Sequence, residues 1–244
     1  MADLDFILPD WPVPRAVRAA VSLRSGGASG GPFASLNLGG HVGDDPAAVA
    51  ENRARLAVSL GLPAEPLWLE QVHGSDVASF GGARAPMADA SVALEQGQVC
   101  AVLVADCLPV LLADREGTCV AAAHAGWRGL AAGVIEKTVA SLPVAPDRLV
   151  AWLGPAIGPE AFEVGGEVRE RFLAADAAAG ESFRPSPAGR WMADIFGLAR
   201  RRLAAAGVKS VHGGGLCTVS DPGRFFSYRR DGMTGRLAAL VWRQ

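Results

Sequence analysis

The sequence predicts an α+β fold organised as a single domain over residues 1–244. Three short apolar runs, at 99–105, 109–114 and 118–125, are typical of buried β-strands, and segments with apolar residues at helical spacing precede and follow them. No internal repeat or low-complexity linker separates these segments. The chain has 244 residues, of which 50% are hydrophobic, so it can bury one sizeable core. We therefore expect strands and helices around that core.

The N-terminal part of the chain contains two strand signals and one helix signal. Residues 17–23 are typical of a strand, and the stretch 24–45 that follows is too rich in Gly, Ser and Asp for either regular element. A helix is predicted over 45–60, with proline in its first turn and glycine directly after it. Residues 66–77 are predicted as a strand that ends in a turn at His73-Gly74.

The C-terminal part of the chain is predicted to be mostly helical. A helix should run over 126–142, and the apolar run 148–154 is a further buried strand. Helices also fit 163–178 and 192–206, each separated from its neighbours by Gly or Pro. The last residues, 225–243, are predicted as a β-hairpin whose turn is the Asp-Gly pair in RRDGMTG.

Composition excludes several classes of partner and compartment. The formal net charge is -2, so no overall basic field indicates nucleic acid or an anionic membrane surface. The chain begins with acidic residues, and nowhere do 18 apolar residues run together, which favours a soluble cytoplasmic protein. The cysteines are widely spaced without a CxxC pair, so we expect core thiols or metal ligands and no disulfide framework.

Two histidines and a cysteine lie where apolar strands give way to turns: His73 in VHGSD, Cys107 in ADCLP and His124 in AHAGWRG. Zinc and copper bind imidazole and thiolate, and a catalytic site normally has three protein ligands and one open position. Because the ends of adjacent strands converge, these three residues are a candidate metal site. The residue types alone leave open a buried cysteine beside two hydrogen-bonded histidines.

Asp106 places a negative charge at the edge of the predicted core. Such a charge is costly unless it is paired with an arginine, a metal-bound group or backbone donors. Arg128 in HAGWRG is one candidate partner, and a solvent-facing arginine at the start of a helix is the alternative.

Seven segments of the chain together resemble the bacterial YfiH-type family. They are SLNLGGHVGDDPAAVAENR, LEQVHGSDV, ADCLPVLLAD, AAAHAGWRGLAAGV, LGPAIGPEAFEVG, LCTVSD and FFSYRRDGMTGR, and they occur in this order from about residue 20 to residue 240. The family is also called the laccase-domain or polyphenol oxidase family, and its members are regarded as multifunctional purine nucleoside phosphorylases.

The resemblance implies a layered α/β/β/α fold with mixed sheets and a single zinc ion held by His73, Cys107 and His124. It also implies phosphorolysis of adenosine, inosine, guanosine and methylthioadenosine, together with adenosine deamination. The expected partners are therefore small purine nucleosides and phosphate. We expect a monomer or a small homo-oligomer.

Two other functions compete with purine nucleoside phosphorolysis. A multicopper oxidase needs many further histidines, and only His41 and His212 remain, although a lone site of this kind can take up Cu²⁺ adventitiously. A cysteine-type hydrolase is the serious rival, because Cys107, His124 and Asp106 supply a thiol, a base and an acid. These three are our catalytic candidates. Some members of the resembling family are linked to editing of peptidoglycan precursors, which is amide chemistry.

Phosphorolysis requires the site to hold an oxyanion and a purine. Arginine suits phosphate through its bidentate fork. The candidate substrate-binding residues are Arg24, Asn37, Arg53, Arg128 and Arg230, and the resembling segments also contain Arg229 and Arg236. Asp89 and Cys217 are further polar or reactive residues in loop or strand-end contexts, with turn capping and a core thiol as their respective alternatives.

Overall fold

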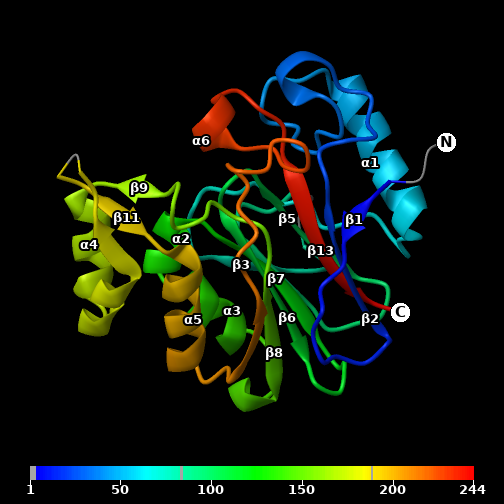
Figure 1. Ribbon diagram of the computed structural model, residues 1–244. Helices are drawn as coiled ribbons and strands as arrows, with labels where there is room; N and C mark the ends of the chain where they lie inside the picture. Colours follow the sequence, from blue (N-terminus) through cyan, green and yellow to red (C-terminus); the bar gives the residue numbers. More distant parts are fainter. Residues whose placement is uncertain (1–3, 83–84, 188) are drawn as a thin grey trace.

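A computed structural model describes residues 4–82, 85–187 and 189–244. Two β-sheets pack face to face, and helices cover both outer faces (Figure 1). One sheet has six strands in the order β12-β8-β6-β7-β4-β3, and the other has four strands in the order β1-β2-β13-β5. The predicted α+β class and the four α/β/β/α layers are confirmed.

The six-stranded sheet is mixed. Its centre is antiparallel, while β3 pairs with β4 and β12 pairs with β8 in parallel. The four-stranded sheet is antiparallel throughout. The strands of the larger sheet are β3 (Val77–Ser79), β4 (Ala90–Ala93), β6 (Leu108–Asp114), β7 (Val120–Ala125), β8 (Leu149–Leu153) and β12 (Ser210–Gly213), and those of the smaller are β1 (Phe6–Ile7), β2 (Val17–Ser22), β5 (Val99–Val104) and β13 (Leu237–Arg243).

The alternation of side chains along the strands divides the core into layers. In β6, Leu108, Val110 and Leu112 pack towards the helices, while Leu111 and Ala113 pack towards the four-stranded sheet. A strand buried on both faces has no polar positions, which is why β6 appears in the sequence as a continuous apolar run.

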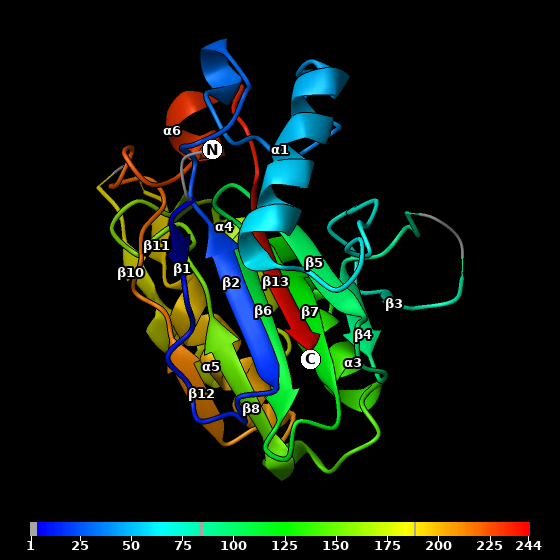
Figure 2. The ribbon, with the colours of Figure 1, turned by 90° about the vertical axis from the view of Figure 1, so that its right-hand side faces the viewer.

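Helices complete the two outer layers. Helix α1 (Pro46–Leu60) covers the outer face of the four-stranded sheet, where Leu56 packs with Ala101 and Leu240 (Figure 2). The opposite layer contains α2 (Trp127–Ala131), α3 (Val134–Ala140), α4 (Gly166–Leu173) and α5 (Ile195–Ala205), with a small sheet of β9 (Glu163–Val164), β10 (Phe183–Pro185) and β11 (Trp191–Ala193). Short 3-10 turns lie at Gly31–Phe33, Pro146–Arg148 and Ala177–Ser182. No helix among the described residues is both long and apolar enough to cross a bilayer.

Several predicted elements are confirmed at the residues expected. Helix α1 begins after Asp45, whose side chain accepts a hydrogen bond from the backbone of Ala47, and it ends at Gly61 in the left-handed conformation. The strands predicted within 17–23, 99–105, 109–114, 118–125 and 148–154 all form.

Other predictions were wrong, and local contacts explain the differences. The helix predicted over 126–142 is interrupted at Gly133, which has φ +90° and separates α2 from α3. In place of the predicted strand at 66–77 there are isolated bridges, and the Gln71 side chain makes hydrogen bonds with both backbone groups of Leu103. The side-chain amide thus takes the place of a backbone partner.

The predictions for the C-terminal part also needed correction. The segments 163–178 and 192–206 each begin in a short strand, β9 and β11, before α4 and α5 start. The C-terminal hairpin does not form. Residues Tyr228–Asp231 make a short helix, α6, capped by the Ser227 hydroxyl, and β13 pairs with β2 and β5. A central position in the sheet gives this apolar strand partners on both edges.

Replacing Leu111 by alanine should lower the free energy of unfolding by about 2–5 kcal/mol, because this side chain is fully buried between the two sheets. Val58 on α1 is 69% exposed, so Val58→Ala should change the same quantity by less than about 0.5 kcal/mol. Denaturant titration of both variants measures the difference. Equal losses in the two variants would contradict the inter-sheet core.

Candidate metal centre

His73 in the loop before β3, Cys107 directly before β6 and His124 near the end of β7 lie close together. Each residue offers one ligand atom, and the three atoms lie within 4.8 Å of one another. Cys107 Sγ is 3.8 Å from His73 Nε2, and the centroids of the two imidazole rings are 4.9 Å apart. The three residues that the sequence nominated as ligands therefore form one cluster that could hold a metal ion.

Sheet register and unusual backbone conformations create this cluster. Pro109 of β6 lies opposite His124 of β7, so Cys107 stands at the end of its strand beside the histidine. Among the described residues only three non-glycine residues have positive φ, and His73 and Asp106 are two of them, at +59° and +90°. Backbone strain concentrated in this way is a feature of functional sites.

The carboxylate of Asp89 supports two of the three candidate ligands. Its side chain is fully buried, and its Oδ1 atom lies 2.8 Å from His124 Nδ1. It also accepts hydrogen bonds from the backbone N–H groups of Val72, His73 and Gly74. Although burial opposes ionisation, these donors lower the pKa of Asp89. With Nδ1 engaged, the Nε2 atom of His124 is available to a metal.

The thiol and the imidazole in this cluster alter each other's protonation. Burial opposes ionisation of Cys107, but His124 and His73 together lower its pKa to about 6. Burial likewise opposes protonation of His124, yet the negative charges of Cys107 and Asp89 raise its pKa to about 9. The surroundings therefore favour the thiolate, which is the form that binds metals and attacks electrophiles.

Asp106 has a different role from the one predicted. Its carboxylate accepts hydrogen bonds from the Thr218 hydroxyl and from the backbone N–H of Arg229, both at 2.6 Å. Of the partners that the sequence left open, a backbone donor together with a hydroxyl is the one found, and Arg128 faces solvent. Asp89, and not Asp106, is the acid on His124. The sequence offered one signal for this, because Asp89 directly precedes the buried strand β4.

A cavity of about 490 Å³ opens beside the cluster. Its wall combines apolar, aromatic and cationic side chains, which suits a ligand with both a flat ring and a negative charge. Besides the three cluster residues, the wall contains His41, Gln71, Leu103, Ala105, Asp106, Trp127, Arg128, Ile157, Phe162, Ile195, Tyr228, Arg229 and Arg236.

Of the five predicted substrate-binding residues, the structure brings only Arg128 to the cavity wall, where it stacks over the Trp127 ring. Arg24 donates hydrogen bonds to the carbonyls of Ala34 and Pro222, and Arg53 donates to that of Leu38. These two guanidinium groups hold loops together.

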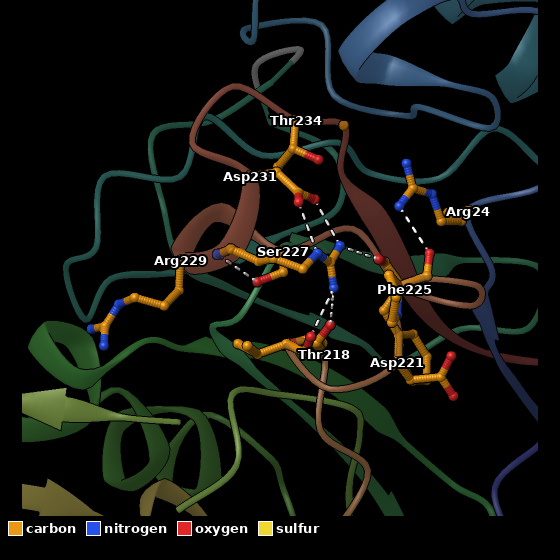
Figure 3. A network of polar contacts seen from close by, with 12 residues as sticks. Arg24, Thr218, Asp221, Phe225, Ser227, Arg229, Asp231 and Thr234 are labelled. Atoms are coloured by element: carbon orange, nitrogen blue, oxygen red, sulfur yellow. Dashed lines mark hydrogen bonds and ion pairs between the residues drawn. The ribbon is translucent and has the colours of Figure 1, made fainter. Parts of the chain in front are cut away.

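Arg230 and Asn37 have similar supporting roles. Arg230 donates to the carbonyls of Thr218, Val219 and Phe225 and pairs with Asp231 (Figure 3). Its neighbour Arg229 points away from that network and donates to the carbonyls of Ala161 and Glu163. Asn37 is fully buried and bonds the backbone of Gly39 and Arg236, together with the carboxylate of Asp44.

Residues 18–244 match the family described as multi-copper polyphenol oxidoreductase laccase. The chain is 60% identical over 240 residues to a purine nucleoside phosphorylase of Pseudomonas aeruginosa, a match that covers 98% of both chains. It is 55% identical over 238 residues to the purine nucleoside phosphorylase YfiH of Escherichia coli, covering 97% of this chain and 98% of the relative.

Solved structures share the fold. A crystal structure of a Neisseria meningitidis protein is 48% identical and has a TM-score of 0.94, covering 98% of this chain and 99% of that one. The crystal structure of a Bacillus licheniformis protein, YfiH, is 28% identical with a TM-score of 0.89, covering 93% of each chain.

Replacing Asp89 by asparagine should weaken divalent metal binding about 10- to 100-fold, because an amide has one acceptor oxygen and no charge and cannot serve both His124 and the backbone N–H groups of 72–74. Competition against a chromophoric chelator measures this affinity. Asp114 provides a matched control, since its carboxylate is equally buried but lies at the other end of β6, bound to Thr118 and Arg148. Asp114→Asn should leave metal affinity unchanged. Unaltered affinity in Asp89→Asn would contradict the supporting role.

Proposed function

The chain belongs to the multi-copper polyphenol oxidoreductase laccase family, the YfiH-type family, and from this premise we propose that it is a zinc-dependent purine nucleoside phosphorylase. Its proposed substrates are adenosine, inosine, guanosine and methylthioadenosine, with adenosine deamination as a second activity. The observation that carries the proposal is the cluster of His73, Cys107 and His124 at the wall of a cavity large enough for a nucleoside, in a chain 60% identical to a protein of that name.

The donor set of the cluster fits zinc. Two imidazole nitrogens and one thiolate sulfur are a ligand set found at catalytic zinc sites, which leave one position for water or substrate. The lowered pKa of Cys107 favours the thiolate, and the hydrogen bond from His124 Nδ1 to Asp89 leaves Nε2 for the metal, which would displace the proton that the raised pKa of His124 otherwise retains. Zinc bound there would supply a Lewis acid and an activated water.

Phosphorolysis sets clear demands on the cavity. An oxygen of phosphate forms a bond to the anomeric carbon while the bond from that carbon to the purine nitrogen breaks. The electron pair of the broken bond leaves with the purine, which takes up a proton. The cationic groups of Arg229 and Arg236 can bind the phosphate, while Phe162 and Trp127, over which Arg128 stacks, offer flat surfaces to the base.

Deamination uses the same cavity with water as the second substrate. Water adds at the purine carbon that carries the amino group, and ammonia leaves, so that adenosine and water give inosine and ammonia. No phosphate takes part in this reaction. The two activities therefore differ in their dependence on phosphate while sharing the proposed zinc.

A cysteine-type hydrolase is the second candidate, and one observation favours it. Cys107, His124 and Asp89 form a thiol, base and acid series, with the pKa of the thiol lowered to about 6. Asp89 is the acid of this series in place of Asp106, which the sequence predicted. Such an enzyme would cleave an amide, for example in a peptidoglycan precursor, through an acyl bond to the sulfur.

Copper is the third possibility that the family description raises. The chain has only four histidines, and of the two outside the cluster His41 lines the cavity while His212 bonds Ser210. A multicopper centre needs more imidazole ligands than this. We propose that any Cu²⁺ bound at the cluster is adventitious, since copper outcompetes zinc for nitrogen and sulfur ligands.

The proposed setting is the cytoplasm, where purine nucleosides and phosphate are the partners. The net charge of -2 offers no general attraction to nucleic acid or to an anionic membrane. A monomer or a small homo-oligomer is proposed.

The state of Cys107 distinguishes the zinc enzyme from the hydrolase. As a zinc ligand, its sulfur should react slowly with alkylating reagents in the metal-replete protein and quickly after chelation. A free catalytic thiolate would react fastest in the native enzyme without any metal. The labelling should be done in a Cys217→Ser background, because Cys217 is the other thiol that is not fully buried. Metal analysis of the same samples should give close to one zinc per chain.

Product analysis tests the reaction itself. Adenosine should yield adenine with ribose 1-phosphate and also inosine with ammonia, and only the first pair should require phosphate. Chromatography with and without phosphate measures both. Cys107→Ser should abolish both product pairs, since it removes a proposed ligand. Adenine that forms equally fast without phosphate would mean hydrolysis of the glycosidic bond.

A further inference from the structure

Arg236 is a half-buried cation on the cavity wall that lies over the Tyr228 ring and keeps one edge of its guanidinium unpaired among the described residues. Its Nη1 atom donates to the carbonyls of Thr234 and Gly235, which belong to its own turn. Among residues 4–82, 85–187 and 189–244, no hydrogen bond or ion pair is formed by its Nε or Nη2 atom. Burial lowers the pKa of Arg236, which means that its charge is costly as it stands. The Nε–Nη2 edge is the edge of guanidinium that binds oxyanions in bidentate fashion.

The neighbouring arginines present their charges differently. Arg24, Arg53 and Arg230 are occupied by backbone carbonyls away from the cavity wall. Arg229 lines the cavity and, like Arg236, donates to two carbonyls through Nη1 alone, but it is exposed to solvent whereas Arg236 is half-buried. Arg128 is solvent-exposed and stacks over Trp127. Arg236 therefore combines partial burial with a free bidentate edge.

The loop beside Arg236 holds it in place. The Asn37 side chain accepts hydrogen bonds from the backbone N–H groups of Arg236 and Gly39, and Leu38 donates its N–H to the Arg236 carbonyl. A Cβ atom on Gly39 would lie 2.7 Å from Arg236 Cγ, so glycine leaves room for the arginine stem. A binding group fixed in this way loses little conformational entropy when it binds a ligand.

The same loop carries His41 into the cavity. His41 lines the cavity wall with Arg236, and burial together with the charges of Arg236 and Arg53 lowers the pKa of His41. The lowered pKa favours the neutral imidazole, which can donate a hydrogen bond to an anion held by Arg236. Burial opposes the charge of Arg236, and the negative groups of Cys107 and Asp106 offset only part of that cost.

We propose that the Nε–Nη2 edge of Arg236, with His41 beside it, is the subsite that binds inorganic phosphate. That this anion is phosphate acting as a substrate rests on the proposed phosphorylase function. Loop 37–41 is then a part of the phosphate site, and Asn37 acts as a positioning residue through Arg236. The predicted link between Asn37 and substrate is therefore indirect.

Calorimetric titration of the metal-loaded protein with inorganic phosphate tests this subsite without any nucleoside. Arg236→Gln should weaken phosphate binding about ten- to hundredfold, because a charge-assisted bidentate contact is lost. Gly39→Ala should also weaken it, since the arginine is displaced while its charge is kept. Gly39 has no positive φ, so alanine suits its backbone. Zinc content, measured on every variant, should stay the same.

Arg128→Gln is the matched control, because it removes the same charge from the same cavity. It should weaken phosphate binding by no more than about fivefold, as expected for an exposed cation. A loss equal to that of Arg236→Gln would overturn the subsite, and so would wild-type protein that binds no phosphate at tens of millimolar. Tighter, Arg236-dependent binding of a nucleoside 5′-monophosphate without binding of free phosphate would also overturn it.

The outcomes separate the subsite from the proposed function. If phosphate binds through Arg236 but adenosine gives no phosphorolysis products, the anion site stands and the phosphorylase proposal fails. If phosphorolysis proceeds and Arg236→Gln binds phosphate as tightly as the wild type, the function stands and the subsite is wrong.

Discussion

The hydrogen bonds to the buried carboxylate of Asp89 are the interaction on which the candidate metal centre depends. One carboxylate binds His124 through its ring nitrogen and the segment 72–74 through three backbone N–H groups. A carboxylate without exposure to water is stable only with such donors, so the donors and the acid stabilise one another. These bonds replace a strand ladder in the segment of His73. They hold that residue in its left-handed conformation beside the imidazole on β7.

The same strand end ties the candidate ligands to the cavity. Cys107 closes the turn between β5 and β6, and Asp106 immediately before it binds Thr218 and the backbone of Arg229. The chain thus links a proposed metal ligand to α6, which brings Tyr228 and Arg229 to the cavity wall. In this turn Asp106 holds α6 through the backbone of Arg229, and the next residue, Cys107, is a proposed metal ligand.

The fold is supported by solved structures, whereas the reaction is argued from side chains. The four layers recur in a solved structure with a TM-score of 0.94, so this chain shares the arrangement of its strands with that protein. Fold alone does not determine a reaction, and the activity has to be argued from side chains. Here the arginines divide by the use of their donors. Arg24, Arg53 and Arg230 donate to the carbonyls of loops, whereas Arg236 donates to carbonyls through Nη1 only, and its Nε–Nη2 edge has no partner among the described residues.

The sequence by itself determined the central strands and the candidate ligands, and the resemblance of its segments to a known family implied the layers. Alternation and apolar runs identify β5 to β8, and residue type with position at strand ends identifies His73, Cys107 and His124. Both signals are local, because they depend on a residue and its near neighbours.

Only the tertiary structure decided which groups surround those ligands. Asp89 binds an imidazole 35 positions away in the sequence, and Asp106 accepts from a backbone N–H 123 positions away. The backbone N–H of Arg236 donates to the side chain of Asn37, 199 positions away. Nothing in a local pattern distinguishes an arginine bonded to carbonyls from one with a free edge. The final strand shows the same limit. Its apolar pattern predicts a strand. Its place between β2 and β5 depends on the assembly of the sheet, because its pairing partners lie far away in the sequence and no local pattern identifies them.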